Sequence, residues 1–555
     1  MPSQKTVDEL AESLEGHLIP RRDGANPVST GGSDRRAAIP MSRGGKSRDS
    51  RYIPNVRTLI REHGSFFLGT TLAALALRLF FFVYFPAVTD DSRIYADLAT
   101  NWLQHGVYGQ TQGVQAEKPI LQTDARLPGY PAFLAAIFWV FGAGNLKAVL
   151  LAQILVDLAT CLMVADLARR AVSDRAARIA FALTALCPFL ANYAAAELTE
   201  TLEIFFTALA LDCAAAALNR MHDARLDVGV PSASSGQALD RTCRKLWAAT
   251  GAAIAACILL RPDGGILLAA VALYLAVLAW KDLAWKHRAG RKDMADVLVA
   301  GTIVVVFALA PLVPWTIRNF RTLHHFQPLA PRYANNADET VSRGFNRWVK
   351  TWIVDYVSVE EIYWNVPGDK IDAEKLPSRA IDNPAERDAT LAVIADYNEA
   401  QDITPELDAR FGNLAADRIR AHPVRYYVVL PVLRVADMWL RPRTEILPPD
   451  VRWWEFHDDA KHSFMAVGFG LLNLAYVAGA LLALVRRPSG IRWAGLLVSF
   501  LLLRSAFLAT LENPEPRYTL ECYPAIIVLA SSLLARYSLR ESQNNQGALA
   551  MTSGQ

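Results

Sequence analysis

Two adjacent carboxylates, Asp90 and Asp91, follow the first long apolar run of the chain and could do chemistry at a membrane surface. Behind them, apolar residues recur at the spacing of one helix face: Tyr95, Leu98, Ala99, Trp102 and Leu103. This pattern predicts a short amphipathic helix lying on the bilayer, with both aspartates at its N-terminal end, where the helix dipole favours negative charge. An ordinary acidic helix cap has the same local pattern, so the rest of the chain must decide between the two.

Several other ionisable residues are expected on the same side of the membrane as this acidic pair. They are the carboxylates Glu197, Glu200 and Asp263 and the cations Arg126, Arg261 and Arg517. Ionisable groups at membrane depth cost free energy and often mark functional sites. Each has a simpler alternative: the arginines could anchor to lipid headgroups, the glutamates could cap a helix, and the aspartate could belong to a turn. The presence of all these charged residues on one side of the membrane favours a functional site more strongly than any one of them does.

A cluster of this composition suits the transfer of a group from a lipid phosphate. A departing phosphate needs cations rather than a proton, and arginine supplies them through bidentate contacts. The attacking hydroxyl needs a base, for which one carboxylate suffices, whereas glycoside hydrolysis requires a paired acid. A helix N-terminus would lower the pKa of Asp90 or Asp91, keeping it charged but weakening it as a base. The second carboxylate could orient a sugar or hold a divalent cation, and the sequence leaves metal use open.

The composition places these residues in a polytopic membrane protein. The chain has 555 residues, is 52% hydrophobic, and carries long apolar runs between residues 66 and 537. The first run begins at Phe66 behind a basic tail, so we expect a retained anchor and no cleavable signal peptide. The six cysteines have no metal-ligand spacing and imply no disulfide framework.

The apolar runs predict an all-α bundle of about 10–12 transmembrane helices, with a surface helix in the first outer loop and a larger outer region. The expected spans are about 66–86, 147–168, 177–195, 200–218, 246–261, 265–280, 296–316, 462–485, 491–511 and 519–537. The run 131–143 would be roughly 20 Å long as a helix, short of a core of about 30 Å, and is expected to span only in part. The run 424–440 carries Arg434 and Asp437, so we expect a surface or partly buried helix there.

Basic residues in the loops orient the bundle. Arginine and lysine cluster at 43–61, 169–178, 220–245, 281–292 and 486–492, which should all be cytoplasmic. Both termini are then cytoplasmic, and the acidic pair and the other candidate residues face outward. This assignment of the loops to the two sides of the membrane holds only if 131–143 does not cross the membrane fully.

The chain should therefore divide into five parts. They are a disordered basic cytoplasmic tail (1–60), a transmembrane catalytic module (61–316) with its first outer loop (87–127), an outer region (317–461), C-terminal transmembrane helices (462–537) and a cytoplasmic tail (538–555).

The order of the motifs resembles the GT-C glycosyltransferases that use polyprenyl-phosphate sugars. The likeness is greatest to bacterial relatives of the protein O-mannosyltransferases and the lipid A aminoarabinose transferases, over about 66–320 and again near 490–537. The motifs that carry it are Asp90-Asp91-Ser92-Arg93-Ile94-Tyr95, Gly106-Val107-Tyr108-Gly109, Arg126-Leu127-Pro128-Gly129-Tyr130-Pro131, Arg261-Pro262-Asp263-Gly264 and Pro516-Arg517-Tyr518.

This resemblance implies a glycosyltransferase, expected to invert configuration, that moves a sugar from a polyprenyl-phosphate donor to a hydroxyl of a glycan, lipid or protein. It would act at the outer face of a bacterial inner membrane. Its expected partners are the lipid-linked sugar, an unidentified acceptor and membrane lipids, without nucleic acid. No cofactor is certain, and a divalent cation is possible.

The resemblance also implies roles for the candidate residues. The expected catalytic residues are Asp90 and Asp91, and the expected donor-phosphate ligands are Arg126, Arg261 and Arg517. The expected substrate contacts are Tyr95, Glu197, Glu200, Asp263 and Tyr518. Many relatives have Asp-Glu where this chain has Asp90-Asp91, so the division of labour between the two aspartates stays open.

Two other functions fit the same composition. One is a lipid-sugar ligase, transporter or flippase, whose charges would line a transport path. The other is a non-catalytic scaffold that presents residues 317–461 to partners. Transport predicts charges buried in mid-span and broken helices. Here the charges cluster at span ends and in loops, which favours chemistry at the surface.

Overall fold

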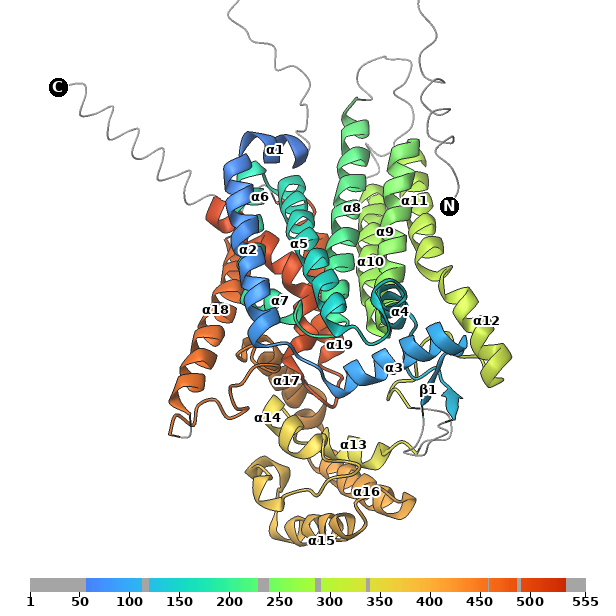
Figure 1. Cartoon of the computed structure of the whole chain (residues 1–555), viewed down its shortest axis with the longest axis vertical. Helices are drawn as coiled ribbons and strands as arrows, with labels where there is room; N and C mark the ends of the chain where they lie inside the picture. The colour runs from blue at the N-terminus through green and yellow to red at the C-terminus, as the bar shows by residue number, and fades with distance from the viewer. Residues whose placement is uncertain are drawn as a thin grey trace, which may run out of the picture. The chain divides into compact units, whose positions relative to one another are not determined.

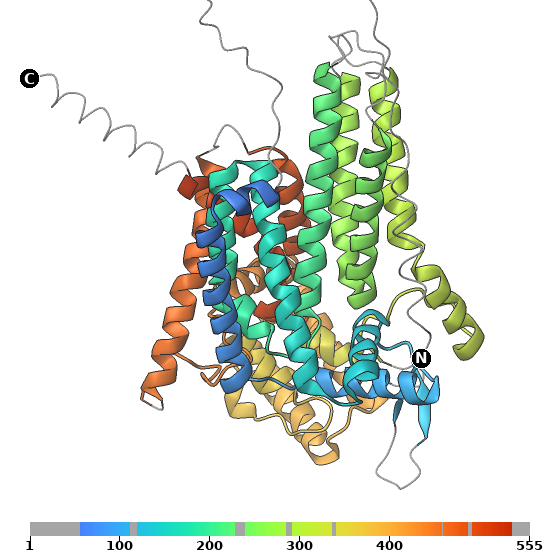
Figure 2. The same ribbon diagram turned by 45° about the horizontal axis from the view of Figure 1, so that its top comes forward.

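The structure is a computed structural model in which long helices run side by side (Figures 1 and 2). It describes residues 56–111, 119–227, 239–284, 291–335, 340–457, 459–486 and 491–535. All the described residues belong to one compact unit. The expected tails 1–60 and 538–555 lie outside the described residues, apart from 56–60.

Helices dominate the described residues. In the bundle they are α1 (Val56–Glu62), α2 (Gly64–Tyr84), α3 (Asp90–His105), α4 (Gly129–Phe141), α5 (Leu146–Ala171), α6 (Asp174–Ala185), α7 (Pro188–Tyr193), α8 (Glu200–Asp227), α9 (Arg241–Leu260), η3 (Pro262–Gly264), α10 (Gly265–Ala284), α11 (Arg291–Leu309), α12 (Leu312–Leu323), α18 (Ala460–Val485), α19 (Ala494–Leu508) and η8 (Pro516–Cys522), which continues as a helix to Ala535. Between α12 and α18 they are α13 (Arg343–Val349), α14 (Tyr356–Ser358), η4 (Val359–Tyr363), η5 (Ala373–Lys375), η6 (Ser378–Ala380), α15 (Pro384–Ala400), α16 (Pro405–Ala421), η7 (Arg425–Val429) and α17 (Leu430–Leu440).

The predicted class, an all-α polytopic membrane protein, is confirmed. Among the described residues, eight helical segments are long and apolar enough to cross a membrane: Gly64–Tyr84, Leu146–Ala171, Glu200–Ala224, Arg241–Leu260, Pro262–Lys281, Met294–Leu323, Ala460–Val485 and Pro516–Ala535. Two shorter apolar helices, α4 and α19, accompany them. Eight of the ten expected spans correspond to these segments, the expected span 491–511 corresponds to α19, and α4 is the run that was expected to span only in part.

α4 starts and ends at the same end of the bundle. Its first residue, Gly129, packs against the end of α9, where an added Cβ would lie 2.5 Å from the Leu259 carbonyl oxygen, so only glycine fits. A turn at 142–145 then leads directly into α5. Figure 1 shows α4 beside α3, at the end opposite α1. The predicted orientation of the basic loops requires that this short run does not cross the membrane, and the position of α4 agrees with that requirement.

The run 177–195, expected as one span, is instead two short helices, α6 and α7. Pro188 starts α7 after a break at Leu186 and Cys187, because proline cannot donate the next helical hydrogen bond. The side chain of Arg78, from α2, lies at the break between α6 and α7. It donates to the carbonyl oxygens of Thr184 and Ala185, the open end of α6, and pairs with Asp157 of α5 at 2.6 Å. A buried ion pair thus closes a broken helix, and α7 leads the chain toward the start of α8.

The predicted helix in the first loop is confirmed as α3. Tyr95, Leu98 and Ala99 are buried, whereas Trp102 and Leu103 are more than a third exposed. After α3, strands β1 (Gly109–Thr111) and β2 (Ile120–Gln122) form an antiparallel pair.

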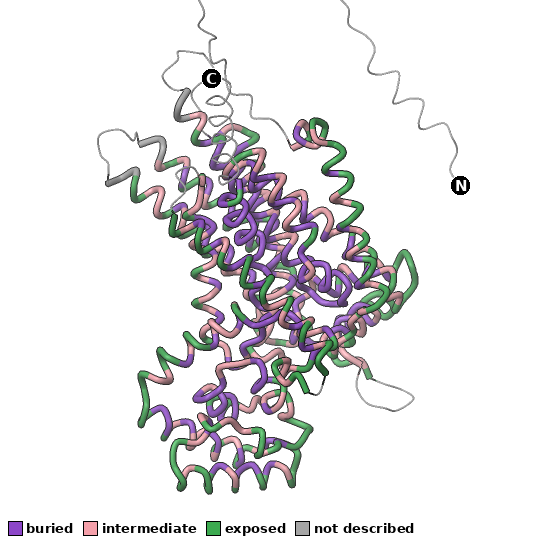
Figure 3. The backbone as a smooth tube through the Cα atoms, turned by 90° about the vertical axis from the view of Figure 1, so that its left-hand side faces the viewer, coloured by how far each residue is buried: buried purple, intermediate pink, exposed green. Residues whose placement is uncertain are grey.

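Residues 343–421 surround a second buried cluster, separate from those of the bundle and built around Phe345, Trp348, Trp352, Tyr397 and Phe411. Figure 3 shows these buried positions within the helices outside the bundle.

The run 424–440 forms η7 and α17, as the partly buried alternative predicted. Arg434 is fully buried and donates to the carbonyl oxygens of Ile353 and Lys350. Asp437 accepts from the backbone N–H of Tyr356 at 3.0 Å. The two charges that argued against a span therefore tie α17 to the ends of α13 and α14.

Candidate active site

A short backbone pairing sets the position of the acidic pair. The N–H of Ala87 donates to the carbonyl of Ala195 at 3.0 Å, and the N–H of Glu197 donates to the carbonyl of Ala87 at 3.2 Å. Thr89 caps α3 in a reciprocal capping box with Ser92. The Ser92 hydroxyl also donates to the Glu197 carbonyl at 2.8 Å. The start of α3 is thereby fixed beside the start of α8.

The two aspartates have different surroundings. The side chain of Asp90 is 92% exposed and pairs with Arg93, one turn along the same helix. Asp91 is 32% exposed, with Oδ1 3.0 Å from Arg126 and Oδ2 3.6 Å from Arg517. Burial would raise the pKa of Asp91, but Arg517, Arg126 and Arg261 together hold it below its ordinary value. Asp91 therefore stays ionised among cations, while Asp90 points away from them.

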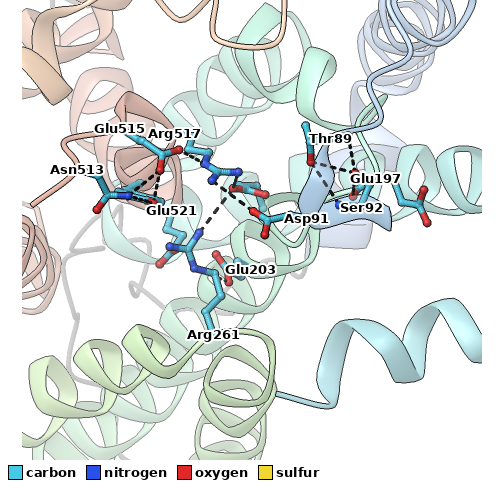
Figure 4. A network of polar contacts seen from close by, with 12 residues as sticks. Thr89, Asp91, Ser92, Glu197, Glu203, Arg261, Asn513, Glu515, Arg517 and Glu521 are labelled. Carbon is cyan, nitrogen blue, oxygen red and sulfur yellow. Dashed lines mark hydrogen bonds and ion pairs between the residues drawn. The ribbon is translucent and has the colours of Figure 1, made fainter. Parts of the chain in front are cut away.

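Arg261 and Arg517 approach Asp91 from different elements (Figure 4). Between them lies Glu200, the first residue of α8, whose Oε1 is 3.6 Å from Arg261 and 3.7 Å from Arg517. The carboxylate of Glu200 is buried, and neither of its oxygens has a hydrogen-bond partner among the described residues. Glu200 is thus shared by the two arginines, each of which also has another carboxylate partner.

Arg517 is oriented by the segment that carries it. Its Nε donates to Glu515 at 2.5 Å, and Glu515 also accepts from the Tyr518 hydroxyl and from Asn513. The ring of Tyr518 lies 4.8 Å from the Arg261 guanidinium, in cation–π geometry. Tyr518 therefore supports one arginine with its ring and the other through Glu515.

A network of buried ion pairs fixes the position of Arg261. Arg261 lies 3.4 Å from Asp263 and 3.6 Å from Glu203. Arg504, fully buried, pairs with Asp263 at 2.6 Å and with Glu521 at 2.7 Å. The structure thus places Asp263 between two arginines rather than in the space before Asp91. The glycine after it is also required, because a Cβ on Gly264 would lie 2.5 Å from the Cys257 carbonyl carbon.

Of the two other predicted substrate contacts, Glu197 lies apart from the arginines, whereas Tyr95 lies near Arg126. Figure 4 shows the Glu197 carboxylate pointing away from Arg261 and Arg517. Burial raises the pKa of Glu197 to about 7. Tyr95 packs edge-on against Tyr130 at 5.1 Å and is buried, which raises its pKa against the lowering effect of Arg126. Of the predicted residues, the structure brings together Asp91, Arg126, Glu200, Arg261, Asp263, Arg517 and Tyr518.

Sequence reasoning missed four members of this network: Glu203, Arg504, Glu515 and Glu521. Two of them carried a signal. Glu203 follows Glu200 by three residues and so shares its helix face. Arg504 is an arginine inside an apolar run, where a charge is costly without a partner.

The arrangement offers a polar space with an ionised carboxylate and three guanidinium groups, which suits an anionic ligand. Among the described residues, no group of three or more His, Cys, Asp and Glu side chains is placed to hold a metal ion. Asp91, Glu200 and Asp263 each face arginines, which would repel a divalent cation. The residues therefore do not fit a metal at this position.

Part of the chain matches a known family. The model of the dolichyl-phosphate-mannose-protein mannosyltransferases matches residues 122–226, from the end of the first loop to α8. This range includes Arg126, Glu197 and Glu200. The match confirms over these residues the resemblance that the motifs indicated. No curated protein sequence matches the chain.

Solved structures with similar folds are more distant. AglB, the oligosaccharyltransferase of Archaeoglobus fulgidus, in complex with an inhibitory peptide and a dolichol-phosphate, is 15% identical, with a TM-score of 0.46 over 89% of this chain and 52% of that one. ArnT from Cupriavidus metallidurans in the apo state is 17% identical, with a TM-score of 0.34 over 86% of this chain and 78% of ArnT. The same ArnT bound to undecaprenyl phosphate is 16% identical, with a TM-score of 0.30 over 84% and 77%. The chain thus spans about half the length of the archaeal structures that it matches.

Proposed function

We propose that this protein is a membrane glycosyltransferase that moves a sugar from a polyprenyl-phosphate donor to a hydroxyl of an acceptor. One observation carries the proposal: Asp91, an ionised carboxylate, lies between Arg126 and Arg517 at the end of a bundle of apolar helices. The phosphate of a lipid-linked donor can reach this end of the bundle while its polyprenyl chain stays in the bilayer. The partial match to the mannosyltransferase family supports the same chemistry.

In this reaction Arg126, Arg261 and Arg517 bind the donor phosphate, and Asp91 accepts the proton of the attacking hydroxyl. The hydroxyl oxygen forms a bond to the anomeric carbon from the side opposite the phosphate. The bond from that carbon to the phosphate oxygen breaks, its electron pair stays on the phosphate, and configuration inverts. The phosphate leaves without a proton because the arginines stabilise its charge. The proton on Asp91 then passes to solvent.

The membrane orientation is part of the proposal. The ends of α5 and α6 carry Arg169, Arg170 and Arg175, and this end of the bundle lies opposite α3 (Figure 1). By the positive-inside rule this end faces the cytoplasm, together with both termini. The candidate site and residues 317–461 then face outward from a bacterial inner membrane.

The break between α6 and α7 favours a second candidate, a transporter, because broken helices and buried charges typify transport paths. Here, however, the buried Arg78 forms an ion pair with Asp157 and donates hydrogen bonds to the carbonyl oxygens at the end of α6, so it does not face a transport path. The ion pair closes the break, so we favour surface transfer.

The test is release of polyprenyl phosphate by the purified full-length protein. It is incubated with a panel of polyprenyl-phosphate sugars and, in parallel, with the matching polyprenyl diphosphate sugars. We expect cleavage of at least one monophosphate donor, with water or an added neutral saccharide as the acceptor of the sugar. Movement of donors across vesicle membranes without cleavage would support the transporter instead.

A further inference from the structure

A second polar pocket lies in the segment between α12 and α18. Its volume is about 390 Å³, and it is formed by residues 356–375 and 441–451. Four carboxylates line it: Glu360, Glu361, Glu445 and Asp450. Neither the motifs nor the candidate donor site uses any of these residues.

The pocket wall is tied directly to the element that carries Arg517. Arg443 is fully buried and donates to the carbonyl oxygen of Pro516 and to the hydroxyl of Thr519. The neighbours of Arg443 in sequence, Arg441 and Glu445, line the pocket. Burial raises the pKa of Glu445, and Arg517 is among the groups that lower it, which agrees with a short separation between the pocket and the arginines. A molecule in the pocket would lie next to the candidate donor site.

Polar atoms on this path lack partners. Both carboxylate oxygens of Glu445 and the hydroxyl of Tyr193 are buried without a hydrogen-bond partner among the described residues. Tyr193 belongs to α7, and its carbonyl oxygen accepts from the hydroxyl of Thr201, the neighbour of Glu200, at 3.1 Å. Buried polar groups are normally satisfied by protein, water or ligand. The orphaned carboxylate of Glu445, which lines the pocket, indicates a ligand that donates hydrogen bonds.

The lining also limits the chemistry of that ligand. Glu361 is neutralised by Arg452, which contacts both of its oxygens at 2.7 and 2.8 Å, and Asp450 accepts from the Arg452 backbone. Glu360 and Glu445 remain as acceptors for hydroxyl groups. The four carboxylates outnumber the two cations of the lining, Lys375 and Arg441, which disfavours a phosphorylated ligand. An alkyl chain would leave the carboxylates desolvated. Tyr356, whose ring lies 5.6 Å from the Arg441 guanidinium, adds one aromatic surface.

We infer that this pocket binds the acceptor, and that the acceptor is a neutral saccharide whose hydroxyl groups donate to Glu360 and Glu445. The inference rests on the proposed transfer of a sugar to a hydroxyl. A bound saccharide would hold one hydroxyl toward Asp91 and the others in the pocket.

Binding of saccharides by the detergent-purified full chain tests this inference without a donor. Tryptophan fluorescence is followed during titration with three neutral trisaccharides of gluco, manno and galacto configuration, and with an uncharged serine-containing tripeptide. We expect saturable binding of at least one trisaccharide and none of the tripeptide. Glu445→Gln and Glu360→Gln should weaken binding about tenfold or more, because each removes a charge-assisted hydrogen bond. Glu374→Gln, an exposed carboxylate in the same segment, is the matched control and should bind as the wild type does.

The inference is overturned if no trisaccharide binds, if the tripeptide binds instead, or if all variants bind equally. If the glutamine variants fail to fold, Tyr356→Phe tests the same wall with a smaller change. Donor cleavage, measured separately, distinguishes the two proposals. Saccharide binding without cleavage would refute the proposed function alone, and cleavage without saccharide binding would refute the acceptor pocket alone.

Discussion

At the scale of single residues, the main result is the asymmetry of two neighbouring aspartates. Both aspartates lie in the first turn of α3, so the sequence alone does not distinguish them. Only Asp91 faces the arginines that the loop before α4, the end of α9 and η8 bring to it, whereas Asp90 faces solvent. A division of labour that the sequence left open thus has a structural basis: one carboxylate contacts the arginines of the site, and the other pairs with Arg93 on the exposed side of α3.

The arginines allow a test of how the donor phosphate is bound. Arg517→Lys and Arg261→Lys each keep the charge but lose the planar pair of donors. We expect donor affinity to fall by about tenfold in each variant, with a smaller effect on turnover of bound donor. Binding of undecaprenyl phosphate to the purified variants measures this. Arg93→Lys, which changes the exposed partner of Asp90, is the matched control. Unchanged donor affinity in both variants would return these arginines to a role in anchoring lipid headgroups.

The buried Glu197 makes a prediction about stability and pH. Its pKa is about 7 in the folded protein against 4.5 in the unfolded chain. The unfolded state therefore loses its proton first, and folding loses stability as the pH rises from about 4.5 to 7. Glu197→Gln should be more stable than the wild type at pH 8, by up to about 3 kcal/mol, and equal to it near pH 4.

Melting temperatures of the detergent-purified protein at pH 4, 6 and 8 measure this difference. Glu399→Gln, which changes an exposed glutamate, should show no such trend. A Glu197→Gln variant less stable than the wild type at pH 8 would mean that the carboxylate has an ionic partner.

At the scale of elements, local signals were sufficient for α3 but not for α6 and α7. The capping residues and the apolar spacing of α3 lie within one short segment, so the sequence could predict it. Pro188 is a local signal for the break, but its closure depends on Arg78, which is more than a hundred residues away, and a hydropathy pattern cannot show such a contact. The same reason explains why Glu203 and Arg504 were missed, since their roles depend on partners from other helices.

The pair Arg78–Asp157 should stabilise the broken helix strongly. Arg78→Met leaves a buried carboxylate and open carbonyls, and is expected to cost about 3–5 kcal/mol. Replacing both partners, as Arg78→Met with Asp157→Leu, should recover much of this loss because no unpaired charge remains. Thermal unfolding in detergent compares the two, with Leu79→Met on the exposed side of α2 as the control. A double variant as unstable as the single one would show that the contacts to the carbonyls dominate.

At the scale of the whole molecule, the sequence predicted the class of fold and the helices that carry the site, since long apolar runs need no tertiary information. It could not specify how three separated segments meet. Arg126 lies in the loop before α4, Arg261 directly follows α9, and Arg517 belongs to η8. Only the packing of these segments around α8 brings the three arginines together. The acceptor pocket is likewise formed by segments whose sequence carries no recognisable motif.

The proposed orientation predicts which loops are accessible from outside the cell. In a cysteine-free background, single cysteines at positions within 340–400 should react with membrane-impermeant thiol reagents in intact cells. Cysteines within 169–178 or 281–292 should react only after lysis, because these basic loops should be cytoplasmic. Labelling of 281–292 in intact cells would contradict the orientation and place the candidate site on the inner side.

The most direct test of the central claim compares the two aspartates in one assay. Release of polyprenyl phosphate from a cleaved donor is measured for Asp91→Asn and Asp90→Asn, with melting temperatures taken on the same preparations. Loss of a general base typically costs about 10²–10⁴-fold in rate, so Asp91→Asn should lose that much while remaining folded. Asp90→Asn should stay near the wild-type rate, because its carboxylate is exposed and faces away from the arginines. Equal, near wild-type rates in both variants, or a larger loss in Asp90→Asn, would contradict the assignment of Asp91 as the base.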